Sequence, residues 1–139
     1  MQVDAMKLIA AAFVACRDGL NTCGPWLAHA RAAMAACAPT GQMRVELDLT
    51  PDPRLRMLLA GPPGRRSDGP WSDDEQHLLS LIEAGLTQAE ALLADPHGGA
   101  ALRQVGAVMV PLPGYLRGGR RPFDPCLLYT SDAADDLYR

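Results

Sequence analysis

The sequence predicts a small, mainly α-helical domain with one short β segment at residues 43–50. Alanine-rich amphipathic stretches recur along the 139 residues, and aromatic side chains make up only 5% of them. A core poor in aromatic rings rests on Leu, Ala, Val, Ile and Met, which favours closely packed helices over a β-sandwich. Only 43–50 alternates apolar and polar residues with the period of a strand. The class becomes α+β if a further C-terminal segment supplies partner strands.

Residues 1–60 predict a helical hairpin that is followed by a strand and a short helix. Asp4 is placed to cap a first helix that ends near Arg17. Turn-forming residues follow, among them Gly19, and Pro25 suits the first turn of a second, alanine-rich helix. The apolar stripe that we expect on the first helix consists of Met6, Ile9, Phe13 and Cys16.

The strand at 43–50 needs a partner, because a single strand leaves its backbone hydrogen bonds unmade. No second segment of similar quality is visible, so we expect the partner from a further C-terminal portion or from another chain. A short helix is predicted from Pro53 to Gly61. The segment 61–70, rich in Gly, Pro and charge, then predicts a linker between the first part of the chain and residues 71–125.

Residues 71–125 contain two sequences typical of capping boxes, in which a hydroxyl and a carboxylate satisfy free N–H groups at a helix start. They are Ser-Asp-Asp-Glu at 72–75 and Thr-Gln-Ala-Glu at 87–90. We expect Gly85 to end the first helix and an Asp-Pro pair to end the second. The next apolar segment, 100–110, fits either a helix or a buried strand.

The two expected helices resemble the first half of a LuxR-type helix-turn-helix, a DNA-binding family. The shared pattern comprises Ser72, Glu75, Leu78, Leu79, Leu81, Ile82, Gly85, Leu86, Thr87 and Glu90. The resemblance implies DNA contact by the segment that follows, where Arg103 and Gln104 have side chains able to reach bases and phosphates. Arg117, Arg120 and Arg121 form a basic loop that could add phosphate contacts.

The C-terminal residues 126–139, CLLYTSDAADDLYR, resemble a translated transposase sequencing adapter. One reading frame of the adapter encodes Cys126 to Asp135 without a mismatch. We therefore expect this tail to be an artefact that interrupts the natural reading frame near Pro125, and we exclude it from fold reasoning. Without the tail the formal net charge moves from −3 to −1, so overall charge favours neither nucleic acid nor an acidic surface.

Three cysteines remain when the tail is excluded: Cys16, Cys23 and Cys37. Their odd number, and the absence of a Cys-X-X-Cys pair, fit no metal-binding pattern. We expect reduced, packed thiols, with one disulfide and one spare thiol as the alternative in an oxidising compartment.

Targeting signals leave two alternatives for localisation. No apolar run reaches the roughly 18 residues of a membrane span, and we expect a cytoplasmic protein. The stretch MKLIAAAFVAC, which starts at Met6, is similar to a short bacterial lipoprotein signal in which Cys16 would carry the lipid.

No catalytic, cofactor-binding or metal-binding motif stands out. Neither a nucleophile elbow nor a phosphate-binding loop is present, and His29, His77 and His97 lie on separate predicted elements. We expect no cofactor. The sequence favours a non-enzymatic interaction or regulatory module that contacts protein or DNA through residues 72–103. The alternative is part of a larger enzyme, or of a lipid-anchored envelope protein, whose functional residues lie beyond residue 125.

Overall fold

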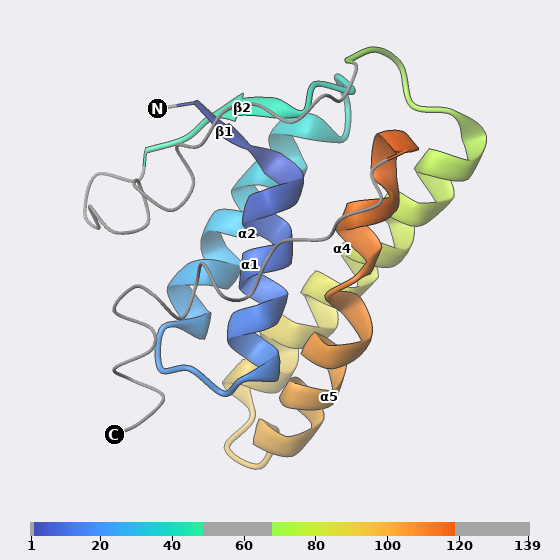
Figure 1. Cartoon of the computed structure of the whole chain (residues 1–139). Coiled ribbons are helices and arrows are strands. Elements are labelled where there is room, and N and C mark those ends of the chain that lie inside the picture. Colours follow the sequence, from blue (N-terminus) through green and yellow to red (C-terminus); the bar gives the residue numbers. More distant parts are fainter. Residues whose placement is uncertain (1, 49–67, 119–139) are drawn as a thin grey trace.

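The computed structural model describes residues 2–48 and 68–118 (Figure 1). These ranges are mainly helical and include one small antiparallel sheet, which confirms the predicted fold class. The elements are β1 (Gln2–Asp4), α1 (Ala5–Arg17), α2 (Cys23–Cys37), β2 (Arg44–Glu46), α4 (Asp73–Ala94), α5 (Gly99–Met109) and the 3-10 helix η1 (Leu112–Gly118). The predicted helix at 53–61, residues 61–67 of the linker, and the tail at 126–139 lie outside the described residues.

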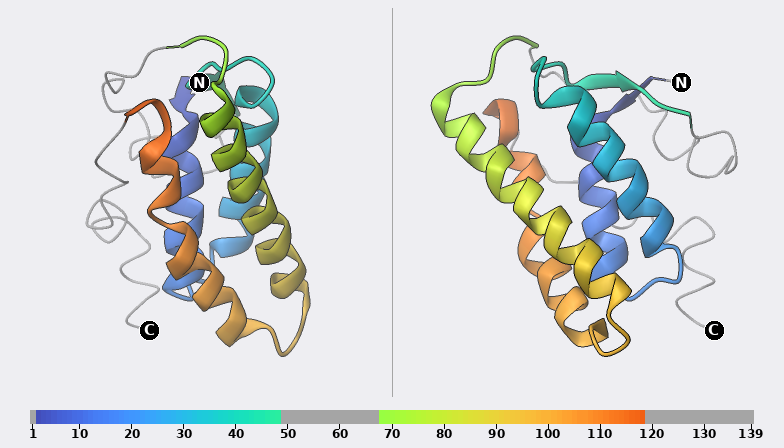
Figure 2. Two further views of the ribbon diagram at one scale, coloured as in Figure 1. Left: turned by 90° about the vertical axis from the view of Figure 1, so that its right-hand side faces the viewer. Right: turned by 180° about the vertical axis from the view of Figure 1, so that it is seen from behind.

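The four α-helices of the described residues form an up-and-down bundle. Helix α1 packs against α2 and α5, and α4 packs against the same two helices from the other side. Consecutive helices run in opposite directions, and the two views of Figure 2 show α4 and α5 side by side along the bundle. The predicted hairpin of α1 and α2 is therefore present, and a second hairpin of α4 and α5 completes the bundle.

Helix α1 is the centre of the bundle. It starts as predicted at Asp4, whose Oδ1 accepts hydrogen bonds from the backbone N–H groups of Met6 and Lys7 at 3.0 and 3.2 Å. The expected single apolar stripe is too narrow a description, since every residue from Ala5 to Cys16 except Lys7 is buried. Contacts with α2, α5 and η1 surround the helix, and a helix that is apolar all round belongs in a core.

A glycine turn ends α1 and starts the connection to α2. Gly19 has a φ of 67°, the left-handed conformation that glycine adopts without a steric penalty. Its N–H donates to the carbonyl of Cys16, and the N–H of Leu20 donates to the carbonyl of Ala15. These two bonds are those of a Schellman motif, so the predicted helix end at this glycine is confirmed.

The strand partner comes from the N-terminus of the chain. β1 pairs antiparallel with β2, with Val3 opposite Val45 and Asp4 opposite Arg44. The expectation of a partner from a C-terminal portion or another chain is thus wrong for β2. Three residues are too few to show a period of two, which is why the sequence pattern missed β1. Within the described residues the strand is also shorter than the predicted 43–50.

Helix α4 is one continuous helix where the sequence pattern predicted two. Its first capping box is confirmed, because the Ser72 and Glu75 side chains each accept a hydrogen bond from the other's backbone N–H. The helix does not end at Gly85, however, and continues to Ala94. An interior glycine costs a helix about 1 kcal/mol. Packing offsets this cost here, since the Met109 side chain of α5 occupies the space that a Cβ at Gly85 would need.

One hydrophobic core joins the helices on both sides of the predicted linker. Phe13 and Leu27 belong to the same buried cluster as Ile82 and Leu86. Trp71 also spans the two sides, because its indole N–H donates to the carbonyl of Cys37 at 3.1 Å. The described helices on the two sides of residues 61–70 therefore share one core. The segment 100–110 is resolved as helix α5.

Candidate functional site

Of the residues that the sequence analysis assigned to DNA contact, Arg103 and Gln104 have described side chains, and these two lie in different surroundings. The Arg103 guanidinium lies against Gly19, where a Cβ would be 2.9 Å from Nε. This places its charge beside the C-terminal end of α1, where helix carbonyls favour a cation. Gln104 instead lines a hollow between α5 and α4. Arg117 belongs to η1, and the remaining two predicted contacts, Arg120 and Arg121, lie outside the described residues.

The outer surface of the second hairpin carries a shallow groove of about 270 Å³ between α4 and α5. We call it the α4–α5 groove, and its lining residues are Gln88, Ala101, Gln104, Val105, Val108 and Met109. None of these side chains titrates or acts as a nucleophile. The volume is below the roughly 300–1,000 Å³ of pockets that enclose small ligands. The groove therefore has the chemistry of a contact surface and lacks the groups of an active site.

Large apolar side chains are exposed beside this groove. Val108 lines it with 63% of its surface exposed. Leu81, which is 45% exposed, lies seven residues before Gln88 on α4, and this spacing of two turns places both on one stripe. Single exposed apolar residues are common on protein surfaces. Their grouping along a hollow is less common and marks contact surfaces.

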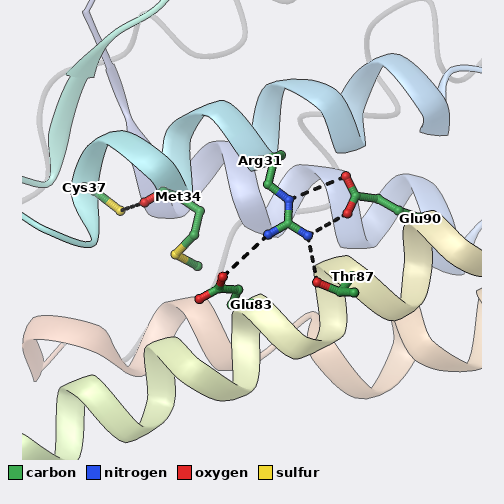
Figure 3. A network of polar contacts seen from close by, with 6 residues as sticks. All are labelled: Arg31, Met34, Cys37, Glu83, Thr87 and Glu90. Atoms are coloured by element: carbon green, nitrogen blue, oxygen red, sulfur yellow. Dashed lines mark hydrogen bonds and ion pairs between the residues drawn. The ribbon is translucent and has the colours of Figure 1, made fainter.

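The opposite side of α4 is occupied by an ion-pair network with α2 (Figure 3). Nη2 of Arg31 lies 2.6 Å from Glu90 Oε1 and 2.9 Å from Thr87 Oγ1, while Nη1 lies 3.9 Å from a Glu83 oxygen. The hydrogen bond that Arg31 donates to the Glu90 carboxylate raises the pKa of Arg31. Thr87 and Glu90, which were predicted to cap a second helix, thus lie in the middle of α4 and bind Arg31 of α2.

This network is a structural clamp between the two hairpins. The side chains of Arg31 and Glu90 are 33% and 41% exposed, so solvent screens the pair, and such pairs stabilise by about 0.2–1 kcal/mol. Because the clamp holds one side of α4 against α2, the stripe with Leu81 and Gln88 is left facing the α4–α5 groove and solvent.

The three described cysteines are buried, free thiols, as predicted. Burial raises the pKa of Cys16 from an ordinary 9.0 to about 12, with a smaller contribution from the nearby Cys23. Burial likewise raises the pKa of Cys23, and it raises that of Cys37 to about 11. The thiolate is the nucleophilic form, so these cysteines are unreactive at neutral pH.

The predicted separation of the histidines is also observed: His29 lies in α2, His77 in α4 and His97 in the loop before α5. Within residues 2–48 and 68–118, no three His, Cys, Asp or Glu side chains gather in a way that would hold a metal ion. None of the helices in these ranges has the length and apolar character needed to cross a lipid bilayer.

Comparison with known proteins assigns no family and no function to the groove. Scans of protein-family models, curated proteins and solved structures each find no match to this chain. The α4–α5 groove and its border are therefore the candidate site on physical grounds alone. Sequence reasoning included Gln104 but missed Gln88 and Val108. The seven-residue spacing of Leu81 and Gln88 was the signal that could have found this stripe of α4.

Proposed function

We propose that this protein is a non-enzymatic interaction module that binds a protein partner through the α4–α5 groove. The observation that carries the proposal is the exposure of Val108 in a groove lined only by apolar and amide side chains. Burying such a side chain contributes about 1.5–3 kcal/mol, which a partner gains on docking. A regulatory role would act through the same contact.

The chemistry of the groove supports binding over catalysis. Its amide side chains, Gln88 and Gln104, can orient a partner by hydrogen bonds but do not act as acids or bases at neutral pH. General acid–base and nucleophilic catalysis both need a titratable or nucleophilic group within hydrogen-bond reach of the reacting atom. The lining residues supply none.

Duplex DNA is the less favoured partner. Asp73, Asp74 and Glu83 place negative charge on the exposed surface of α4. The guanidinium of Arg103 lies beside the C-terminal end of α1. Binding to a phosphate backbone requires clustered cations and weakens steeply as salt rises. We expect no salt-dependent binding when the full chain is titrated with duplex DNA at low and at physiological salt. Salt-dependent affinity would instead favour the LuxR-like interpretation.

A peptide-library selection tests the proposal. Binders selected against the full chain are counter-screened against Val108→Asp, which puts a charge into the groove, and against Ala107→Asp. Ala107 is also exposed on α5 but does not line the groove, so it is a matched control. We expect enriched peptides to bind the wild type and the control at least about tenfold more tightly than Val108→Asp. The proposal fails if no enriched peptide distinguishes the two variants.

A further inference from the structure

The shape of the α4–α5 groove suits a third helix. The groove lies between two antiparallel helices that run side by side (Figure 2), and a helix packs into such a groove through aliphatic side chains at i, i+3, i+4 and i+7. Val105, Val108 and Met109 offer apolar surface on the α5 side. Leu81 continues this surface on α4.

The stripe of α4 that borders the groove is negative at both ends. Asp74, Leu81 and Gln88 of α4 and Asp95, the C-cap residue that follows its last turn, recur at intervals of seven residues, so they follow one stripe along the helix. Both aspartates are exposed, and they are separated by about 30 Å at 1.5 Å per residue. The lining residues of the groove carry no cation that would balance them.

The acidic residues at the N-terminal end of α4 outweigh the positive end of the helix dipole. The N-terminus of a helix carries about half a positive charge. The first turn of α4 holds three acidic residues, Asp73, Asp74 and Glu75, which exceed that partial charge. At the other end, Asp95 is exposed to solvent, and its Oδ1 accepts a hydrogen bond from the backbone N–H of His97.

We propose that the α4–α5 groove binds an amphipathic helix of about 20 residues whose apolar face is flanked by basic side chains at both ends. This inference rests on the proposed function and adds the chemistry of the partner. Each cation of the partner faces an aspartate, and its aliphatic side chains cover Val108 and Leu81.

A second copy of this chain is a poorer occupant for electrostatic reasons. Two copies docked antiparallel through their grooves would place Asp74 of each beside Asp95 of the other. A parallel arrangement would place each aspartate beside its own counterpart. Both arrangements bring like charges together, which opposes association.

Two designed helical peptides test the charge and the shape separately. Both carry Leu at i, i+3, i+4 and i+7, and they differ only in having Lys or Glu at both ends. Binding to the full chain is measured by fluorescence anisotropy. We expect the Lys peptide to bind about tenfold more tightly than the Glu peptide at low salt, and this preference to shrink as salt rises.

Variants of the full chain identify the residues responsible. Asp74→Asn with Asp95→Asn keeps an acceptor for the His97 N–H and is expected to abolish most of the Lys-over-Glu preference while the Leu-dependent binding remains. Val108→Asp is expected to weaken both peptides, and Ala107→Asp neither. Circular dichroism and urea unfolding of each variant check that the bundle is retained.

Several outcomes overturn the inference. Equal binding of the two peptides, no binding of either, or a preference that survives in the double Asn variant each contradicts it. A dimer in sedimentation analysis that Val108→Asp dissociates would assign the groove to a second copy. If library peptides depend on Val108 but the Lys peptide has no advantage, the proposed function stands and only this inference fails.

Discussion

Gly106 sets the distance between α1 and α5. A Cβ at this position would meet the backbone of α1, within 3 Å of both the Phe13 carbonyl oxygen and the Arg17 Cα. Backbone atoms cannot move aside as a flexible side chain can, so we expect Gly106→Ala to lower the free energy of unfolding by at least about 2 kcal/mol.

Gly99 provides the control for this change. It is also in α5, and nothing lies within 4 Å of a Cβ built there. Because alanine reduces the freedom of the unfolded chain, we expect Gly99→Ala to stabilise by about 0.4–1 kcal/mol. Urea unfolding measures both variants. Equal effects would contradict a close approach of the two helices at Gly106.

The buried thiols make stability sensitive to alkaline pH. The pKa of Cys16 is about 12 and that of Cys37 about 11, against an ordinary 9.0. An acid whose pKa is raised on folding holds its proton more tightly in the folded state. Its contribution to stability is therefore complete below pH 9 and is lost as the pH rises toward 11 and 12. Near pH 10 we expect each thiol to cost about 1 kcal/mol of stability.

Urea midpoints at pH 7.5 and at pH 10 check this expectation, with Cys16→Ala/Cys37→Ala as the reference for lysine and tyrosine titration. The wild type should lose more stability between the two pH values than the double variant does. Parallel losses would mean that the two thiols titrate alike in the folded and unfolded chain.

At the residue scale, the sequence predicted roles that depend on neighbours in the chain. Asp4, Gly19 and Ser72 cap or terminate helices through local hydrogen bonds, and all three are confirmed. The role of Gly106 was invisible, because the α1 backbone that it contacts is about 90 residues away in the chain. The exposure of Val108 likewise follows from which side of α5 the bundle covers.

At the scale of elements, α4 shows how a local pattern can mislead. The sequences at 72–75 and 87–90 look alike as capping boxes, but only the first lies at a helix start. Thr87 and Glu90 are used by Arg31 instead. A capping sequence in the middle of a helix has no free N–H groups to satisfy, so tertiary packing across Gly85 decides whether the helix is broken.

Alanine substitutions distinguish one helix from two. We expect Ser72→Ala to cost about 1 kcal/mol, because the N–H of Glu75 loses its acceptor. Thr87→Ala loses one exposed hydrogen bond to Arg31 but gains helix propensity, so its net effect is expected to stay within about 0.5 kcal/mol. Chemical denaturation gives both values. A cost at Thr87 equal to that at Ser72 would restore the prediction of two helices.

At the scale of the whole molecule, the sequence predicted the class of the fold but not the contacts between its distant segments. Composition and periodicity indicated helices and one β segment. They could not show that Gln2–Asp4 pairs with β2, or that the helices on both sides of 61–70 bury a common core. Both features are contacts between distant segments. The candidate groove depends on this assembly, because it exists only where α4 and α5 lie side by side.

The common core predicts that the chain unfolds in one cooperative transition. Trp26 lies in α2 and Trp71 two residues before α4, so the two tryptophans belong to segments on the two sides of the predicted linker. We compare the urea transition by tryptophan fluorescence with that by far-UV circular dichroism in Trp26→Phe and in Trp71→Phe. Trp71→Phe is expected to be less stable, since it loses the hydrogen bond to the Cys37 carbonyl.

In each variant, however, fluorescence and circular dichroism should give the same urea midpoint. Two separate domains would give a fluorescence midpoint that differs from the circular dichroism midpoint, because each tryptophan would follow only its own side.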